Sequence, residues 1–262
     1  MTRPWRLLLD PAAPGALNMG RDLAILEAVA QRAVPPTVRL YGWSPPCLSL
    51  GRHQPTEAAD LDFCRHRGID VVRRPTGGRA VLHDVELTYA TVASLGEGRL
   101  PRNLQQAYRV ICAGLVKACR RLGIEAELTP GEVNLQLLGP RSVVPCFKAP
   151  AGGEVVVRGR KLIGSAMRRY QGTILQHGAV LLDWDGELQA GAVGLADDSS
   201  LRPFVTTVAA ELGRIPPLGT LREAMAAGIA ETLGVSLQPG ELSPAEHQRA
   251  AEAAVESTVP AS

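Results

Sequence analysis

The sequence predicts an α+β fold in which a mixed β-sheet core is flanked by helices. Short apolar runs typical of strands dominate the middle of the chain, whereas the pattern from about residue 204 is helical. Strands and helices do not alternate regularly, which disfavours a doubly wound parallel sheet. With 262 residues, of which 45% are apolar, the chain can bury a substantial core. We expect a main domain at 1–215 and a C-terminal helical extension at 216–262, packed on the same domain.

The first helix is indicated by apolar residues spaced four, three and four positions apart, as on one buried helical face. These residues are Met19, Leu23, Leu26 and Ala30. They predict a helix over 19–33. Residues 37–41 and 47–50 have β-type composition and predict two strands separated by a proline-rich turn. Thr56 is then expected to open a short helix that ends near Gly68.

A strand, a loop and two further apolar runs follow. Residues 69–73 have strand character and lead into a glycine-containing turn at 75–78, after which the apolar pattern resumes at 80–82 and 87–92. The clearest helix comes next, at 103–123, with an asparagine as its N-cap and a glycine as its C-terminal stop.

The second half of the chain begins with strands and ends with helices. Residues 154–163 predict a hairpin with a tight turn at Arg158-Gly159, and residues 173–182 predict another apolar strand. Capping boxes at 220–223 and 243–246 indicate helix starts. The last five residues are expected to fray.

Composition narrows the class of protein. A formal charge of +2 is too small to indicate a nucleic-acid-binding surface, and no apolar run is long enough for a signal sequence or a membrane span. We therefore expect a cytoplasmic protein that binds neither nucleic acid nor membrane. The cysteines are Cys47, Cys64, Cys112, Cys119 and Cys146. They contain no Cys-x-x-Cys pair, so neither a disulfide framework nor a metal site is expected, and no cofactor is indicated.

The segment 73–84 combines two glycines with arginines and a histidine, a composition suited to an anionic or carbonyl-bearing ligand. The same residues are also compatible with a simple turn that carries solvated arginines. The candidate substrate-binding residues in this segment are Arg74, Thr76, Gly77, Gly78, Arg79 and His83.

Two residues are candidates for catalysis. Cys146 lies between Pro145 and Pro150 in a predicted loop, which would leave its thiol accessible, although lone cysteines are more often small core residues. Lys161 lies where a strand leads into the small residues Gly164, Ser165 and Ala166, which permit close approach by a ligand. An ammonium group near a thiol would favour the thiolate.

A third segment, Gln176-His177-Gly178, places polar groups within an apolar strand. Burying such groups in a core costs free energy unless they are hydrogen-bonded or face a pocket. His177 is therefore compatible both with a hydrogen-bonded core residue and with a ligand contact.

Together, the segments 73–84, 159–166 and 174–178 resemble motifs of the biotin/lipoate protein ligase and lipoyltransferase superfamily, in order and in spacing. The similarity covers about residues 20–210 and implies a biotin/lipoate ligase-like catalytic domain followed by C-terminal helices. The cysteine-dependent octanoyltransferases are the most similar members, because Cys146 stands fifteen residues before Lys161.

The resemblance implies an acyltransferase that takes octanoate from octanoyl-acyl carrier protein, holds it as a thioester on Cys146, and passes it to a lysine of an apo lipoyl-carrier protein such as glycine cleavage H protein. Lys161 would assist the thiol. The substrate-binding set would extend to Gly164, Ser165 and Ala166 and to Gln176, His177 and Gly178. Seven arginines are expected to attract the typically acidic partner proteins: Arg65, Arg67, Arg73, Arg74, Arg79, Arg168 and Arg169.

Other functions remain open at this stage. One is an octanoyl amidotransferase that moves octanoate between lipoyl carriers through the same cysteine. Another is an ATP-dependent lipoate-protein ligase, although such ligases tend to carry a third glycine where this chain has Arg79. The last is a non-catalytic module that only binds acylated carriers.

Overall fold

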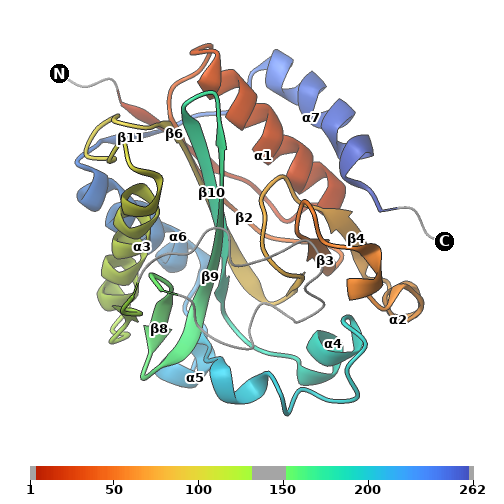
Figure 1. Ribbon diagram of the computed structural model, residues 1–262. Coiled ribbons are helices and arrows are strands. Elements are labelled where there is room, and N and C mark those ends of the chain that lie inside the picture. Colours follow the sequence, from red (N-terminus) through yellow and green to blue (C-terminus); the bar gives the residue numbers. More distant parts are fainter. Residues whose placement is uncertain (1–3, 132–151, 260–262) are drawn as a thin grey trace.

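The computed structural model describes residues 4–131 and 152–259, and Figure 1 shows how its elements are arranged. Eight strands within these ranges form one large sheet. In spatial order they are β11 (Leu237–Pro239), β1 (Trp5–Leu9), β2 (Thr37–Tyr41), β6 (Glu86–Ser94), β10 (Thr173–Leu181), β9 (Arg160–Tyr170), β8 (Val155–Val157) and β7 (Glu127–Leu128). β1 is parallel to β11 and β2, and the other neighbours are antiparallel. The predicted mixed sheet is confirmed.

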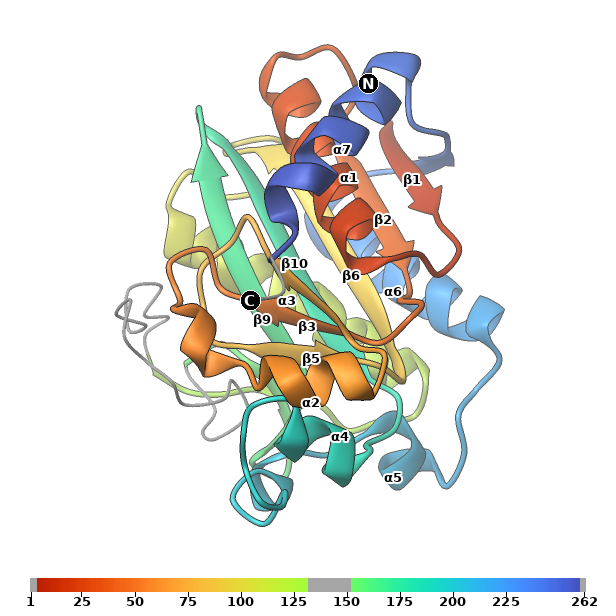
Figure 2. The ribbon, with the colours of Figure 1, turned by 90° about the vertical axis from the view of Figure 1, so that its right-hand side faces the viewer.

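A second, smaller sheet contains β3 (Cys47–Leu50) between β4 (Asp70–Arg73) and β5 (Val81–His83). β3 is parallel to β4 and antiparallel to β5. Figure 2 shows this sheet in front of the large one, and a hydrogen bond from its β4–β5 loop reaches β10. The predicted strands 37–41 and 47–50 are confirmed, but they belong to different sheets.

Helices cover both faces of the large sheet. The helices in the described residues are α1 (Gly15–Ala30), α2 (Leu61–His66), α3 (Leu104–Arg121), α4 (Gly186–Gly191), α5 (Val208–Leu212), α6 (Leu218–Leu233) and α7 (Pro244–Ser257), with short 3-10 turns η1 (Thr56–Ala58) and η3 (Arg202–Phe204). Figure 1 shows α3 and α6 on one side and α1 and α7 on the other. The larger core lies under α3 and α6, and a second core lies under α1. The helices pack closely: a Cβ on Gly228 of α6 would lie 2.4 Å from the Gly114 carbonyl of α3.

Several predicted helix ends are confirmed. The Asn103 side chain accepts a hydrogen bond from the Gln106 amide at the start of α3, and Ser243 and Glu246 form the expected capping box at the start of α7. The capping box predicted at 220–223 is wrong, because α6 begins two residues earlier, after Pro217. Fixing φ at this proline favours the helix start there.

The helix expected from Thr56 is interrupted. Ala59 and Asp60 are extended, so η1 ends before α2 begins. The carboxylate of Asp60 accepts a hydrogen bond from the Phe63 amide, which makes Asp60 the N-cap of a separate helix.

Described residues near both ends of the chain pair with other segments. β1 and β11 were not predicted as strands, yet they pair with each other at the edge of the large sheet. Fraying of the last five residues is wrong for the two that the structure describes: Thr258 pairs with Val72, and the Val259 amide donates to the Val71 carbonyl.

Beyond residue 215, α6 packs on α3, β11 extends the large sheet, and α7 packs on α1. A domain division near that residue stays a prediction. In the part of the chain that the structure describes, no helix has the length and apolar character needed to cross a membrane.

Candidate active site

A buried ion pair joins the β8–β9 hairpin. The Lys161 Nζ lies 2.8 Å from Glu154 Oε2, and the two side chains are only 1% and 8% exposed. The predicted tight turn is present, with Arg158 and Gly159 at φ values of 48° and 74°. Glu154 was not predicted as a site residue; the available signal was a carboxylate at the start of an apolar strand.

One extra residue in β9 determines where Lys161 lies. Val156 pairs with Lys161 but Val155 pairs with Ile163, so Leu162 is inserted into the ladder. Val155 and Ile163 face the core under α3. Because neighbouring strand residues alternate between faces, Val156 and Lys161 lie on the opposite face.

Backbone contacts fix both partners of this pair. The Thr129 amide donates to the Glu154 carbonyl, the Glu154 amide donates to Thr129 Oγ1, and the Thr206 amide donates to the Lys161 carbonyl. The predicted nucleophile Cys146 lies outside the described residues.

The glycine loop is held from within by Arg74. This buried guanidinium donates to the backbone carbonyls of Ser49, Gly77 and Arg79, each through a contact of 2.8 Å. Gly78 has a φ of 100°, and a Cβ on the neighbouring Gly51 would lie 2.0 Å from its carbonyl oxygen. Arg74 therefore shapes the loop, while Gly77 is exposed: apart from its chain neighbours, no described residue has an atom within 4 Å of the position that a Cβ would occupy.

His177 connects the loop to the large sheet. Its Nε2 lies 2.7 Å from Thr76 Oγ1, and its Nδ1 lies 2.8 Å from Asp22 Oδ2 of α1. All three residues are buried. Burial lowers the pKa of His177, and the charges of Arg74 and His83 add to this effect, although Asp22 opposes it. Asp22 was not predicted as a site residue, yet its spacing from Met19 and Leu26 places it on the predicted buried face of the first helix.

His83 makes a similar set of contacts at the edge of the small sheet. Its Nδ1 lies 2.9 Å from Glu86 Oε1, and its Nε2 lies 2.8 Å from Ser49 Oγ. The indole of Trp43 stacks on the imidazole, with 4.0 Å between ring centroids. Glu86 and Trp43 were likewise not predicted.

Gln176 faces the other side of the sheet. Its Nε2 donates to Tyr89 Oη at 3.0 Å and to Cys112 Sγ of α3 at 3.3 Å, and the Tyr89 hydroxyl donates to Ser165 Oγ at 2.7 Å. Gln176 and Ser165 thus lie on the α3 face of the sheet, away from His177.

Gly164 and Ala166 lie on the same face of the sheet as His177, whereas Gly178 lies on the α3 face, next to Ser165 and Tyr89. Ala166 pairs with His177, and Gly164 pairs with Ala179. A Cβ on Gly178 would lie 2.3 Å from the Gly164 carbonyl, so glycine permits this close strand contact.

The four cysteines that the structure describes are unsuited to nucleophilic chemistry. Cys47, Cys64, Cys112 and Cys119 are all buried. Burial raises the pKa of Cys64 to about 11 and the pKa values of Cys112 and Cys119 to about 12, and it raises that of Cys47 well above its ordinary value.

Several arginines expected to attract partners have local roles. Arg65 pairs with Asp62, Arg67 pairs with Glu187, and Arg73 donates to the Gly51 carbonyl.

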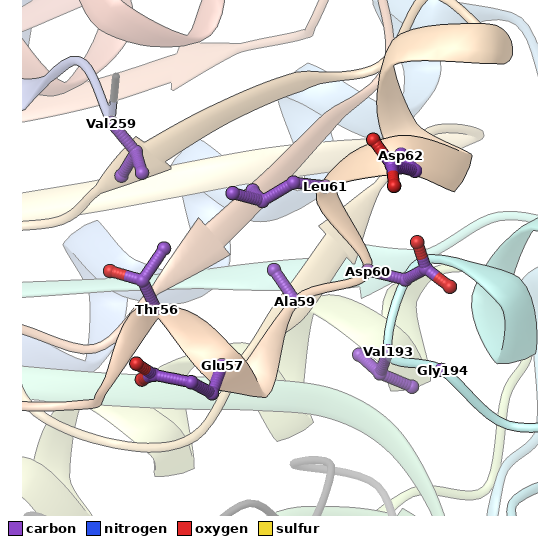
Figure 3. Close-up of a pocket in the computed structure, with 9 residues that line it drawn as sticks. All are labelled: Thr56, Glu57, Ala59, Asp60, Leu61, Asp62, Val193, Gly194 and Val259. Atoms are coloured by element: carbon purple, nitrogen blue, oxygen red, sulfur yellow. The ribbon is translucent and has the colours of Figure 1, made fainter. Parts of the chain in front are cut away.

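A separate cavity of about 710 Å³ lies between η1, α2 and the end of α4, and Figure 3 shows the residues that line it. Three of them are the carboxylates Glu57, Asp60 and Asp62. None of the predicted site residues that the structure describes lines this cavity. Among the described residues, no cluster of three or more His, Cys, Asp or Glu side chains is arranged to hold a metal ion.

Known proteins resemble this chain in sequence. The family described as "Lipoyl protein ligase A/B catalytic domain" matches residues 14–230. Octanoyltransferase LipM of Kyrpidia tusciae is 43% identical over 255 residues, which cover 94% of this chain and 93% of the relative. Octanoyltransferase LipM of Geobacillus kaustophilus is 46% identical over 188 residues, which cover 70% of this chain and 67% of the relative.

Solved structures resemble the fold. Lipoate-protein ligase A bound with ATP has a TM-score of 0.78 at 24% identity, covering 98% of this chain and 95% of that chain. A bi-partite lipoate protein ligase from Thermoplasma acidophilum has a TM-score of 0.76 at 24% identity, covering 97% and 92%. These likenesses confirm the predicted biotin/lipoate ligase-like fold.

Proposed function

The chain belongs to the lipoyl protein ligase A/B catalytic-domain family, and on this premise we propose that it is an octanoyltransferase of lipoate biosynthesis. The donor is octanoyl-acyl carrier protein, and the acceptor is a lysine of an apo lipoyl-carrier protein such as glycine cleavage H protein. The reaction takes place in the cytoplasm. The observation that carries the proposal is 43% identity to an octanoyltransferase over nearly the whole length of both chains.

The reaction proceeds through a thioester on Cys146. The Cys146 thiolate attacks the donor carbonyl and expels the phosphopantetheine thiolate, which takes up a proton. The acceptor lysine loses a proton from its ammonium group, and the neutral amine attacks the new thioester. As the amide forms, the Cys146 thiolate leaves and the nitrogen gives up a second proton to solvent. Burial and raised pKa values of the other four cysteines support this choice of nucleophile.

Lys161 lowers the pKa of the Cys146 thiol and orients the acyl carbonyl. Glu154 holds the ammonium group at one place, because the 2.8 Å ion pair is buried and the hairpin backbone around it is hydrogen-bonded. Glu154 thus keeps the Lys161 ammonium group in a fixed position that water does not reach.

The backbone near Gly77, Gly78 and Gly164 to Ala166 binds the acyl carbonyl and steadies the developing oxyanion. The exposed position of Gly77 and the small side chains on β9 support this assignment. An apolar slot for the eight-carbon chain supplies about 0.8 kcal/mol for each methylene buried, so anchoring needs no charged contact.

Transfer assays with apo H protein test the proposal against its closest alternatives. The octanoyl group is supplied as octanoyl-acyl carrier protein, as octanoylated H protein of a distinguishable mass, or as free octanoate with ATP. We expect transfer from the carrier-protein thioester without ATP. Preference for octanoylated H protein would identify an amidotransferase, and dependence on ATP with free acid would identify a ligase; either result overturns the proposed donor.

A further inference from the structure

A continuous hydrogen-bond chain links the interior of the protein to the glycine loop. Arg39 Nη1 of β2 donates to Asp22 Oδ1 of α1 at 2.7 Å, and the Tyr41 hydroxyl donates to Asp22 Oδ2 at 2.9 Å. Asp22 Oδ2 also lies 2.8 Å from His177 Nδ1, and His177 Nε2 lies 2.7 Å from Thr76 Oγ1. Side chains from two strands, a helix and a loop are thereby joined in series.

The direction of each hydrogen bond follows from the charge of Asp22. Burial alone would raise the pKa of Asp22, but the hydrogen bond with His177 and the charge of Arg39 outweigh burial and lower it. Asp22 is therefore a carboxylate and only accepts hydrogen bonds. The proton of neutral His177 must then sit on Nδ1, and Nε2 must accept from the Thr76 hydroxyl.

Thr76 is also fixed through its backbone, because its carbonyl accepts a hydrogen bond from the Arg52 amide at 2.8 Å. The side chain is fully buried and so has no exposed surface for substrate. The next residue, Gly77, is exposed. The buried hydroxyl of Thr76 is thus the side-chain contact that holds the loop directly before its exposed residue Gly77.

We propose that Asp22 and His177 are positioning residues that hold the Thr76 hydroxyl and thereby fix the Gly77–Gly78 backbone for contact with the acyl carbonyl. This inference rests on the proposed function of the loop. It gives His177 an indirect role through Thr76 and adds Asp22, which lies on a helix distant in sequence from the loop.

Substitutions of Thr76 test the inference with little change in shape. Thr76→Val removes the hydroxyl but keeps the branched side chain, whereas Thr76→Ser keeps the hydroxyl. We expect Thr76→Val to lower kcat about 10–100-fold with a small change in KM for the donor, because misplaced loop amides weaken transition-state contacts. Thr76→Ser should recover most of this loss. Equal kcat for Thr76→Val and wild type would overturn the inference.

The pH dependence of kcat distinguishes a positioning role of the His177–Thr76 hydrogen bond from a role in packing alone. Asp22 contacts His177 directly and is itself hydrogen-bonded to Arg39 and Tyr41, and the charges of Arg74 and His83 also act on the imidazole. Protonation converts Nε2 into a donor, so the Thr76 hydroxyl must turn its proton away and accept the hydrogen bond instead, which changes how the loop is held. The ratio of wild-type to Thr76→Val kcat should be constant through the ordinary histidine range, about pH 6.5, and should change only at lower pH, where the hydrogen bond reverses. A ratio that never changes with pH would indicate packing alone and contradict the inference.

A spectroscopic readout is independent of octanoyl transfer. Nitrogen-15 NMR of the histidine side chains should show His177 as the Nδ1–H tautomer, with the signal assigned by its loss in His177→Asn. Thr76→Val should shift the Nε2 resonance, and Thr76→Ser should leave it near its wild-type position. An Nε2–H tautomer would overturn the inference. If the tautomer is as expected but wild type transfers no octanoate, the proposed function fails while the hydrogen-bond geometry stands.

Discussion

Lys161 and Glu154 form a 2.8 Å ion pair whose two side chains are almost completely shielded from water. The extra residue Leu162 turns Lys161 to the face of the sheet that carries Gly164 and Ala166. Because of this bulge, the buried ion pair lies on the same face of the sheet as the residues that we assign to acyl binding. The pair is a structural element and part of the proposed catalytic machinery at once.

Glu154→Gln should destabilise the fold by about 3–5 kcal/mol, because it leaves a buried ammonium without its counter-charge. Urea unfolding measures the change in the free energy of unfolding. Glu231→Gln is the matched control, since Glu231 pairs with Lys117 and Arg121 on the surface and its loss should leave stability near wild type. Equal stability of both variants would show that the buried pair contributes little.

Lys161→Ala should raise the pKa of the Cys146 thiol and slow its acylation, because a cation that favours the thiolate is removed. The pH profile of Cys146 alkylation by iodoacetamide reports the change directly. Lys117→Ala removes an exposed lysine on α3 and serves as the control. An alkylation profile in Lys161→Ala that matches wild type would rule out the proposed role of Lys161.

Native wild type should be alkylated rapidly at Cys146 alone when the pH is below 9. The other thiols stay protonated there, since the pKa of Cys64 is about 11 and those of Cys112 and Cys119 are about 12. They are also shielded from the reagent. Peptide mapping after brief alkylation identifies the modified residues. Rapid labelling of a buried cysteine under native conditions would contradict this pattern.

Asp22→Asn should flatten the dependence of stability on pH in acid. The folded-state pKa of Asp22 is lowered, so the unfolded chain binds the proton more readily and the free energy of unfolding rises with pH. This contribution is fully present above the unfolded value of about 3.9 and is lost as pH falls through the folded value. Glu246 acts with the same sign, so part of the slope remains. Unfolding curves between pH 2 and 6 provide the measurement; an identical slope in both proteins would exclude Asp22 as a contributor.

The features predicted best from the sequence are those formed by residues close together in the chain, such as helix caps. Asn103 and the Ser243–Glu246 box were recognisable because caps are formed by residues three positions apart. The pairing of β1 with β11 was not, because it joins residues more than 200 positions apart and neither strand has a strong pattern of its own.

The site shows the same division. The motifs identified Lys161 and His177, but their carboxylate partners, Glu154 and Asp22, were missed because a partner is set by three-dimensional contact. Asp22 lies 155 positions from His177. Glu154 lies near Lys161 in the chain, but the inserted Leu162 decides which face Lys161 occupies, and a bulge has no reliable local signature.

Intact-protein mass spectrometry after mixing with octanoyl-acyl carrier protein, without ATP, tests the thioester mechanism most directly. Wild type and Cys64→Ala should each gain one octanoyl group that hydroxylamine removes, whereas Cys146→Ser should gain none. The thioester mechanism would be contradicted if wild type gained no octanoyl group and octanoylated an apo lipoyl-carrier protein only when ATP and free octanoate were supplied.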